Sequence, residues 1–191
     1  TCQSVLGRRG GPLLAVLALL VTGAALRQVA WTEAVGAPVK LALLQTNIEQ
    51  GLKWRPEMLQ RWLDVNVAML RDNPAEIVVL PETTLPLLVE YLPPGYLDEL
   101  RRVAADNGGD VILGTFVRNE AGHIFNAAIS LGRSAAGYYA KQHLVPFGEY
   151  SPPLFRWFYE LVNIPMADQT RGPERQPPML LAGQKVAVNI C

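Results

Sequence analysis

The sequence predicts an α/β fold, with one membrane-spanning helix placed before a larger domain of alternating strands and helices. Three observations predict it: an uncharged apolar run near the start, short apolar segments that alternate with amphipathic ones after residue 38, and two later apolar segments joined by a turn. Acidic and basic residues balance at 17 each, so we expect no nucleic-acid partner, which would favour a basic surface. Only 18% of the residues are charged, against about 25% in typical soluble domains, and a membrane segment would explain the difference.

The first expected element is the apolar run from Gly10 to Leu26. Its length is at the short end of the roughly 17–25 residues that cross a bilayer. Arg8 and Arg9 precede the run, so the positive-inside tendency places the start of the chain in the cytoplasm and everything after Trp31 on the outer face of the membrane. A secretory signal peptide and a buried soluble helix are the alternatives. We expect residues 1–31 to form a transmembrane helix, the last part of a membrane domain, and residues 32–38 to form a linker.

Residues 39–191 are expected to form the catalytic domain, in which strands and helices alternate. Gly and Pro residues separate the elements, and the short apolar segments between them are typical of buried strands. The expected elements, in order, are a strand over 39–45, a helix that Pro56 opens and 72–74 ends, a strand over 76–80, a helix over 96–107, a hairpin of 111–117 and 124–131, a strand over 138–141, a loop-rich segment over 143–178 and a last strand over 185–190.

Three residues could carry chemistry only in combination. Glu82 follows a buried strand, at the carboxyl end where catalytic groups of open α/β sheets collect. Lys141 ends an aromatic strand, and Cys191 closes an apolar one. Each has an ordinary explanation when taken alone: a loop carboxylate, a surface lysine and an inert buried thiol. The only histidines, His123 and His143, form no metal-binding pattern, so we expect neither a metal nor another cofactor.

The combination resembles the carbon–nitrogen hydrolase (nitrilase) superfamily, whose members use a Glu-Lys-Cys triad in that chain order. More narrowly, it resembles the apolipoprotein N-acyltransferase family, and the stretch from Lys141 to Tyr150 is the specific part. The resemblance implies a partial nitrilase-type α-β-β-α sandwich that is truncated at its nucleophile. The matching segments are Leu80-Pro81-Glu82-Thr83, Lys141-Gln142-His143-Leu144-Val145-Pro146-Phe147-Gly148-Glu149-Tyr150 and Val188-Asn189-Ile190-Cys191.

The resemblance also implies a role for each site residue. Glu82 would be the general base that takes the proton of Cys191, the nucleophile, because a thiol is mostly protonated at neutral pH. Lys141 would stabilise the thiolate and the developing oxyanion. Glu149 would hold Lys141 or relay protons, although an ordinary loop carboxylate is the alternative. Trp54 resembles a family position that lines the acyl pocket.

The implied reaction moves an acyl chain from a phospholipid, similar to phosphatidylethanolamine, to the N-terminal diacylglyceryl-cysteine of a lipoprotein through a cysteine thioester. It would take place on the periplasmic face of the bacterial inner membrane. The alternatives are a membrane-anchored or exported carbon–nitrogen hydrolase (amidase or nitrilase) and a non-catalytic lipid-binding relative. The apolar segments 85–88 and 155–159 would contact lipid or pack under loops. We expect the chain to be an internal fragment that is inactive and poorly folded by itself.

Overall fold

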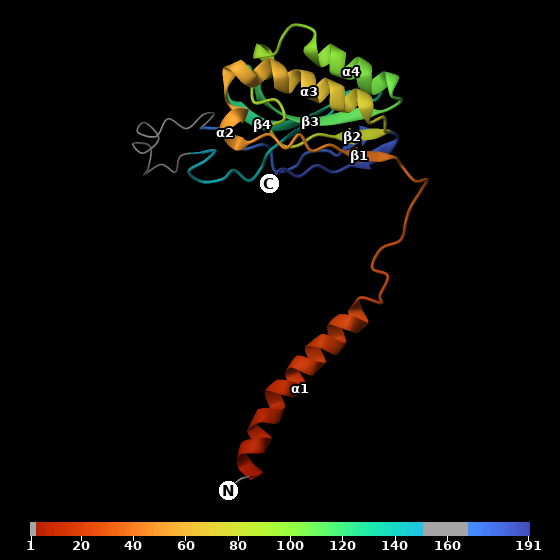
Figure 1. Ribbon diagram of the computed structural model, residues 1–191, viewed down its shortest axis with the longest axis vertical. Coiled ribbons are helices and arrows are strands. Elements are labelled where there is room, and N and C mark those ends of the chain that lie inside the picture. The colour runs from red at the N-terminus through yellow and green to blue at the C-terminus, as the bar shows by residue number, and fades with distance from the viewer. Residues whose placement is uncertain (1–2, 151–167) are drawn as a thin grey trace. The chain divides into compact units, whose positions relative to one another are not determined.

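The computed structural model describes residues 3–150 and 168–191, and it divides the chain into two compact units (Figure 1). The first unit is Thr1–Pro38 and the second is Val39–Cys191. The predicted boundary between linker and catalytic domain therefore coincides with the boundary between the units. The predicted lipid-contacting segment 155–159 lies outside the described residues.

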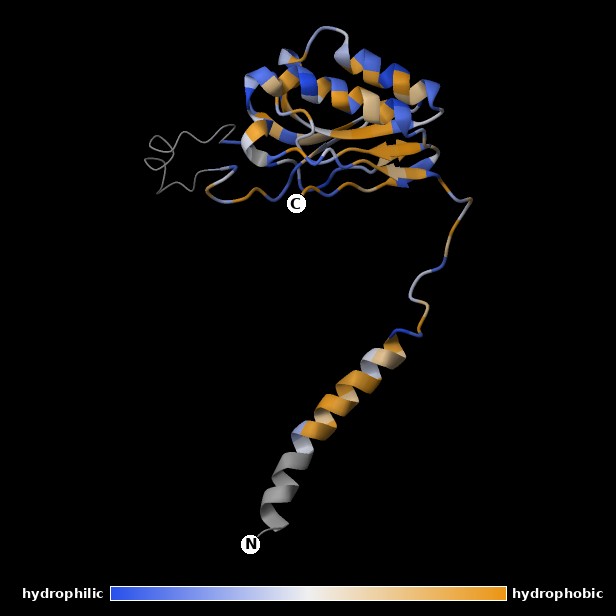
Figure 2. Cartoon of the chain, in the orientation of Figure 1, coloured by the Kyte–Doolittle hydropathy of each residue, from blue (hydrophilic) through white to orange (hydrophobic). Residues whose placement is uncertain are grey.

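The first unit contains one helix, α1 (Gln3–Leu26), and its central residues are apolar (Figure 2). Arg8 and Arg9, which precede the apolar run, lie within this helix. The helix continues to Leu26, and the side chains described along it, from Gly11 onward, are exposed. In the part of the chain that the structure describes, no helix combines the length and the apolar content needed to cross a membrane, so the predicted membrane-spanning helix is not confirmed.

The second unit is built on a five-stranded sheet in the order β1-β2-β3-β4-β5. The first three strands are parallel, and the last three are joined as antiparallel neighbours. The nine-residue strands β3 and β4 pair along their whole length, which confirms the predicted hairpin. The strands are β1 (Leu41–Leu43), β2 (Ile77–Val79), β3 (Asp110–Arg118), β4 (Ile124–Gly132) and β5 (Tyr138–Ala140).

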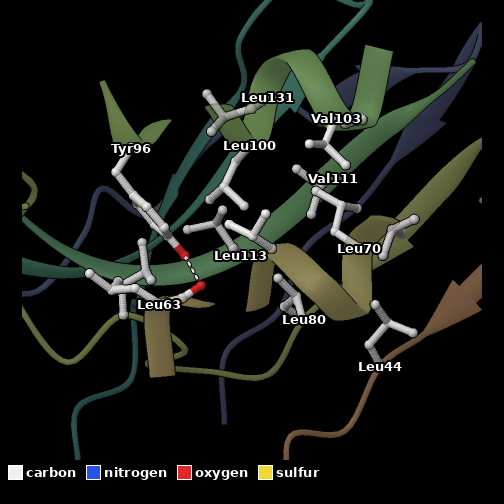
Figure 3. Packing of buried hydrophobic residues seen from close by; sticks show 14 of the residues in the cluster. Leu44, Leu63, Leu70, Leu80, Tyr96, Leu100, Val103, Val111, Leu113 and Leu131 are labelled. Carbon is white, nitrogen blue, oxygen red and sulfur yellow. Dashed lines mark hydrogen bonds between the residues drawn. The ribbon is translucent and has the colours of Figure 1, made fainter. Parts of the chain in front are cut away.

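Helices α3 (Leu59–Asp72) and α4 (Tyr96–Asp106) cover one face of this sheet (Figure 1). Both follow the 3.6-residue period: α4 buries Tyr96, Leu100 and Val103, which share one face of the helix. The core beneath them is apolar, and the hydroxyl of Tyr96 donates to the Leu63 carbonyl at 3.1 Å (Figure 3). Short helices precede and connect them: α2 (Gln50–Lys53) and the 3-10 turns η1 (Pro56–Met58) and η2 (Val89–Tyr91).

Of the two expectations for residues 85–88, lipid contact or packing under loops, the structure confirms packing, because these residues belong to the core. The side chain of Leu85 is fully buried and that of Leu88 is 4% exposed. The main chain explains this, since Leu85 N–H donates to the Gly114 carbonyl and Leu88 forms a bridge with Phe116. The segment is therefore fixed along β3 with its leucines facing inward.

A second core lies on the other face of the sheet, under the hairpin of β6 (Met179–Leu181) and β7 (Gln184–Val186). Met179 and Leu181 pack there against Ile77 and Ile112 of the sheet. The buried carboxylate of Asp110, 2% exposed, joins the layers because it accepts hydrogen bonds from Ser134 and from the Ala182 N–H. Helices, sheet and hairpin thus form three layers, α-β-β, in agreement with the predicted partial sandwich.

The last predicted strand is only partly correct. Pairing with β6 ends at Val186, because β6 itself is only three residues long. Residues 187–191 therefore form no strand within the described chain. Ile190 nevertheless packs in the second core at 9% exposure, and this contact keeps Cys191 beside the sheet.

Candidate active site

Glu82 is presented by a tight main-chain turn where β2 ends. Leu80 N–H donates to the Ile112 carbonyl and Leu85 N–H donates to that of Gly114, so residues 81–84 form a loop between two points on β3. Thr83 takes a positive φ of 52°, a conformation that is unfavourable for a β-branched residue. The loop displaces Glu82 from the path of the strand.

A glycine beneath this loop makes the turn possible. A Cβ atom at Gly114 would lie 2.4 Å from the Thr83 nitrogen and 2.9 Å from both the Cα and the carbonyl carbon of Glu82. These are main-chain atoms, which cannot rotate away as a flexible side chain can. Gly114 therefore allows the Glu82 main chain to lie directly on β3, and nothing in the linear sequence pointed to it.

Lys141 lies one residue beyond β5, and its side chain is 1% exposed. Its Nζ atom donates to Oε1 of Glu82 at 3.0 Å and to Oε1 of Glu149 at 2.6 Å. Burial lowers the pKa of Lys141, but the hydrogen bonds to Glu149 and Glu82 and their charges outweigh it, so the pKa is raised above its ordinary value. The lysine is therefore a permanent cation at neutral pH.

The main chain of Ala140 and Lys141, at the end of β5, is hydrogen-bonded on both edges. On the inner edge, Lys141 N–H donates to the Asn126 carbonyl of β4 at 2.8 Å. On the outer edge, the Gln176 side chain accepts from the Ala140 N–H and donates to the Ala140 carbonyl, both at 2.7 Å, as a neighbouring strand would. Gly172 N–H donates to the Lys141 carbonyl at 2.8 Å. These contacts leave the lysine little freedom to move away from the carboxylates.

Glu149 connects Lys141 to the loop that follows it. One carboxylate oxygen binds Lys141, and the other accepts the Val145 N–H at 2.9 Å. The Glu149 side chain is only 16% exposed, unlike an ordinary loop carboxylate. This geometry fits a residue that holds Lys141, one of the roles that the family resemblance implies for Glu149.

Asn126 is a site residue that the sequence interpretation missed. Its Nδ2 donates to Oε1 of Glu82 at 2.7 Å, so this oxygen accepts from both Asn126 and Lys141. Asn126 lies on β4 and is 2% exposed. A buried amide in an otherwise apolar strand was the available signal, because such a group requires a polar partner.

Cys191 and Glu82 line the same cavity, which has a volume of about 220 Å³. The cysteine is free and exposed, so its thiol is accessible. The rest of the lining is mainly apolar, including Leu80, Ile112 and Leu113. Glu82 thus connects two parts of the predicted site: it accepts a hydrogen bond from Lys141, which also donates to Glu149, and it lines the mainly apolar cavity that contains Cys191.

Trp54 lies apart from this cavity among the described residues. Its ring packs at 6.2 Å, centroid to centroid, against Phe116. The adjacent Lys53 is closer to the site, since its Nζ donates to the Glu82 carbonyl at 3.3 Å. The role of Trp54 in an acyl pocket stays a prediction. Nowhere in residues 3–150 and 168–191 could three His, Cys, Asp or Glu side chains together hold a metal ion.

A protein-family model described as carbon-nitrogen hydrolase matches residues 40–191, which include every site residue named above. The chain belongs to the carbon-nitrogen hydrolase family. The fold agrees: a CN-hydrolase superfamily protein from Xanthomonas campestris superposes with a TM-score of 0.52 at 20% identity, over 75% of this chain and 50% of that one.

Curated relatives with higher sequence identity than this structure carry the name apolipoprotein N-acyltransferase. The apolipoprotein N-acyltransferase of Nitrosomonas europaea is 41% identical over 172 residues, 88% of this chain and 35% of that protein. The apolipoprotein N-acyltransferase of Chromobacterium violaceum is 41% identical over 187 residues, 96% of this chain and 36% of that protein. The chain thus spans about a third of the length of these relatives.

Proposed function

We propose that the full-length protein containing this chain is an N-acyltransferase that moves an acyl chain from a phospholipid to the N-terminal diacylglyceryl-cysteine of lipoproteins. One observation carries the proposal: Glu82, which pairs with the buried Lys141, lines the same cavity as Cys191, a free and accessible cysteine. The relatives named apolipoprotein N-acyltransferase support the choice of reaction. The apolar lining of the cavity suits an acyl donor better than a small polar amide.

In the first half-reaction Glu82 takes the thiol proton of Cys191, and the thiolate attacks the ester carbonyl of the phospholipid. A carbon–sulfur bond forms as the ester carbon–oxygen bond breaks, and Glu82 returns the proton to the departing lysophospholipid oxygen. Lys141 offsets the charge that develops on the carbonyl oxygen. Because Glu149 and Glu82 hold Lys141 in place, no reorganisation of this cation is needed during the reaction.

In the second half-reaction the α-amine of the lipoprotein attacks the thioester. Glu82 accepts a proton from the amine, a carbon–nitrogen bond forms, and the thiolate leaves and is protonated again. One nucleophile thereby divides a difficult transfer into two easier steps. We place this activity at the bacterial inner membrane, with the catalytic domain on the periplasmic side, because both substrates are lipids or carry lipid anchors.

The group that accepts the acyl chain distinguishes this function from the hydrolase alternative: it is the lipoprotein amine in the acyltransferase and water in a hydrolase. Purified full-length enzyme is incubated with a phospholipid labelled in its acyl chain and a diacylated peptide with a free N-terminus. We expect label in the peptide amide, and none when the peptide N-terminus is acetylated. Release of the label only as free fatty acid, with or without the peptide, would instead indicate a hydrolase.

A further inference from the structure

A second, polar cavity adjoins the reaction cavity at Pro81 and Glu82, which line both. It has a volume of about 170 Å³, and it shares only Pro81 and Glu82 with the cavity that holds Cys191. At about 30 Å³ per water molecule, it has room for a group the size of a few waters. Its lining is formed by Gln45, Thr46, Ile48, Lys53, Pro81, Glu82, Thr83 and Thr84.

Lys53 is the only basic residue in this lining, and it lacks an ionic partner among the described residues. Its one hydrogen bond there is the long contact to the Glu82 carbonyl, which leaves most of the three ammonium donors unused. Burial lowers the pKa of Lys53, while the charge of Glu82 opposes that shift. A half-buried cation without a counter-ion is stabilised by an anion that enters the cavity.

Other polar groups of the cavity are also available. Within the described chain the side chains of Gln45 and Thr46 have no hydrogen-bond partner, so an amide and a hydroxyl can donate to a ligand. The carboxylate of Glu82 would repel an anion, but it accepts hydrogen bonds at Oε1 from the Lys141 ammonium and from the Asn126 amide, which reduce that repulsion. The cavity therefore presents one ammonium with unused donors, together with an amide and a hydroxyl.

We propose that this cavity binds the phosphodiester of the acyl donor through Lys53, which makes Lys53 a specificity residue for phospholipids. The inference rests on the proposed function. In a glycerophospholipid the phosphate and the acyl esters are attached to one glycerol, so the anion and the reacting carbonyl must be bound close together. The two cavities share Pro81 and Glu82 in their linings and so meet that requirement, with the phosphate at Lys53 and the ester at Cys191.

The test compares two donors of the same acyl chain, phosphatidylethanolamine and the uncharged p-nitrophenyl ester, on the full-length enzyme. The readout is the rate of acylation of Cys191, followed by intact-protein mass. We expect Lys53→Met to slow acylation by phosphatidylethanolamine about 10- to 100-fold more than acylation by the neutral ester, the range expected for a hydrogen bond to a charged group. Lys53→Arg should keep most of the preference. Lys185→Met, which changes an exposed lysine of β7, is the matched control and should change neither rate.

Several results would overturn the assignment. If Lys53→Met slows both donors equally, Lys53 only holds the Glu82 carbonyl and binds no phosphate. Inorganic phosphate provides a second measurement on the unmodified enzyme, and it should inhibit acylation by the phospholipid more than acylation by the neutral ester; equal inhibition counts against the site. Inhibition by phosphate together with unchanged phospholipid acylation in Lys53→Met would indicate a site for free phosphate instead. If the unmodified enzyme takes no acyl chain from phospholipid, the proposed function itself fails.

Discussion

Replacing Gly114 by alanine should disable the site although none of the reacting residues is replaced. The added Cβ would lie 2.4 Å from the Thr83 nitrogen, whereas ordinary contacts begin at 3.4 Å, so the main chain of residues 82–83 must retreat by about 1 Å. The Glu82–Lys141 distance of 3.0 Å would then exceed hydrogen-bonding range. A displacement of about 1 Å at a catalytic group can cost about 100-fold in rate.

The assay is the rate of acylation of Cys191 by labelled phospholipid in the full-length enzyme, measured together with thermal unfolding. We expect Gly114→Ala to lower the rate about 100-fold and to cost about 1–3 kcal/mol of stability, as overpacking typically does. Gly51→Ala is the matched control, because a Cβ there meets no atom within 4 Å and the position is helical. A rate within threefold of the unmodified enzyme for Gly114→Ala would refute the argument that this glycine sets the position of Glu82.

Three further outcomes are expected. Asn126→Leu should slow acylation about 10-fold, because it removes a hydrogen-bond donor to Glu82. The melting temperature should stay nearly unchanged, because the buried Oδ1 of Asn126 accepts no hydrogen bond within the described chain. A large loss of stability would contradict this. Asp110→Asn should cost about 1–3 kcal/mol in urea unfolding, since an amide places a donor against donors, whereas the exposed Asp98→Asn should cost little. The pKa of Lys141 is raised above its ordinary value of 10.5 in the folded protein, so the unfolded chain loses this proton at lower pH than the folded chain does. The free energy of unfolding should therefore fall as pH rises above about 10.5. Lys141→Met should lack this part of the pH dependence of unfolding.

The places of Glu82 and Lys141 near strand ends could be predicted from the sequence, because apolar runs ending in polar residues are visible in a single chain. Their grouping into one site came instead from the resemblance to the carbon–nitrogen hydrolases. The fold class follows from the same alternation of elements, and the long β3–β4 hairpin was confirmed. Local patterns suffice for these features because each depends on a few consecutive residues.

Features that depend on pairing between distant segments could not be predicted. Asn126 reaches Glu82 only because β4 pairs in one register with β3, on which the Glu82 loop lies, and Gly114 matters only because the loop after β2 crosses β3. The apolar run that Cys191 closes is a similar case: it looks like a strand, but within residues 3–150 and 168–191 no strand pairs with it beyond Val186. The burial of Leu85 likewise depends on the path of β3 rather than on its own sequence context.

The central claim is that Cys191 carries the acyl chain. Full-length enzyme is incubated with phosphatidylethanolamine without an acceptor, digested, and analysed by mass spectrometry for the peptide that contains Cys191. We predict a mass increase of one acyl chain that hydroxylamine removes, as it does thioesters, and that is absent in Cys191→Ala and strongly reduced in Glu82→Gln. An acyl group on another residue, or transfer of label to a diacylated peptide by Cys191→Ala, would contradict the account.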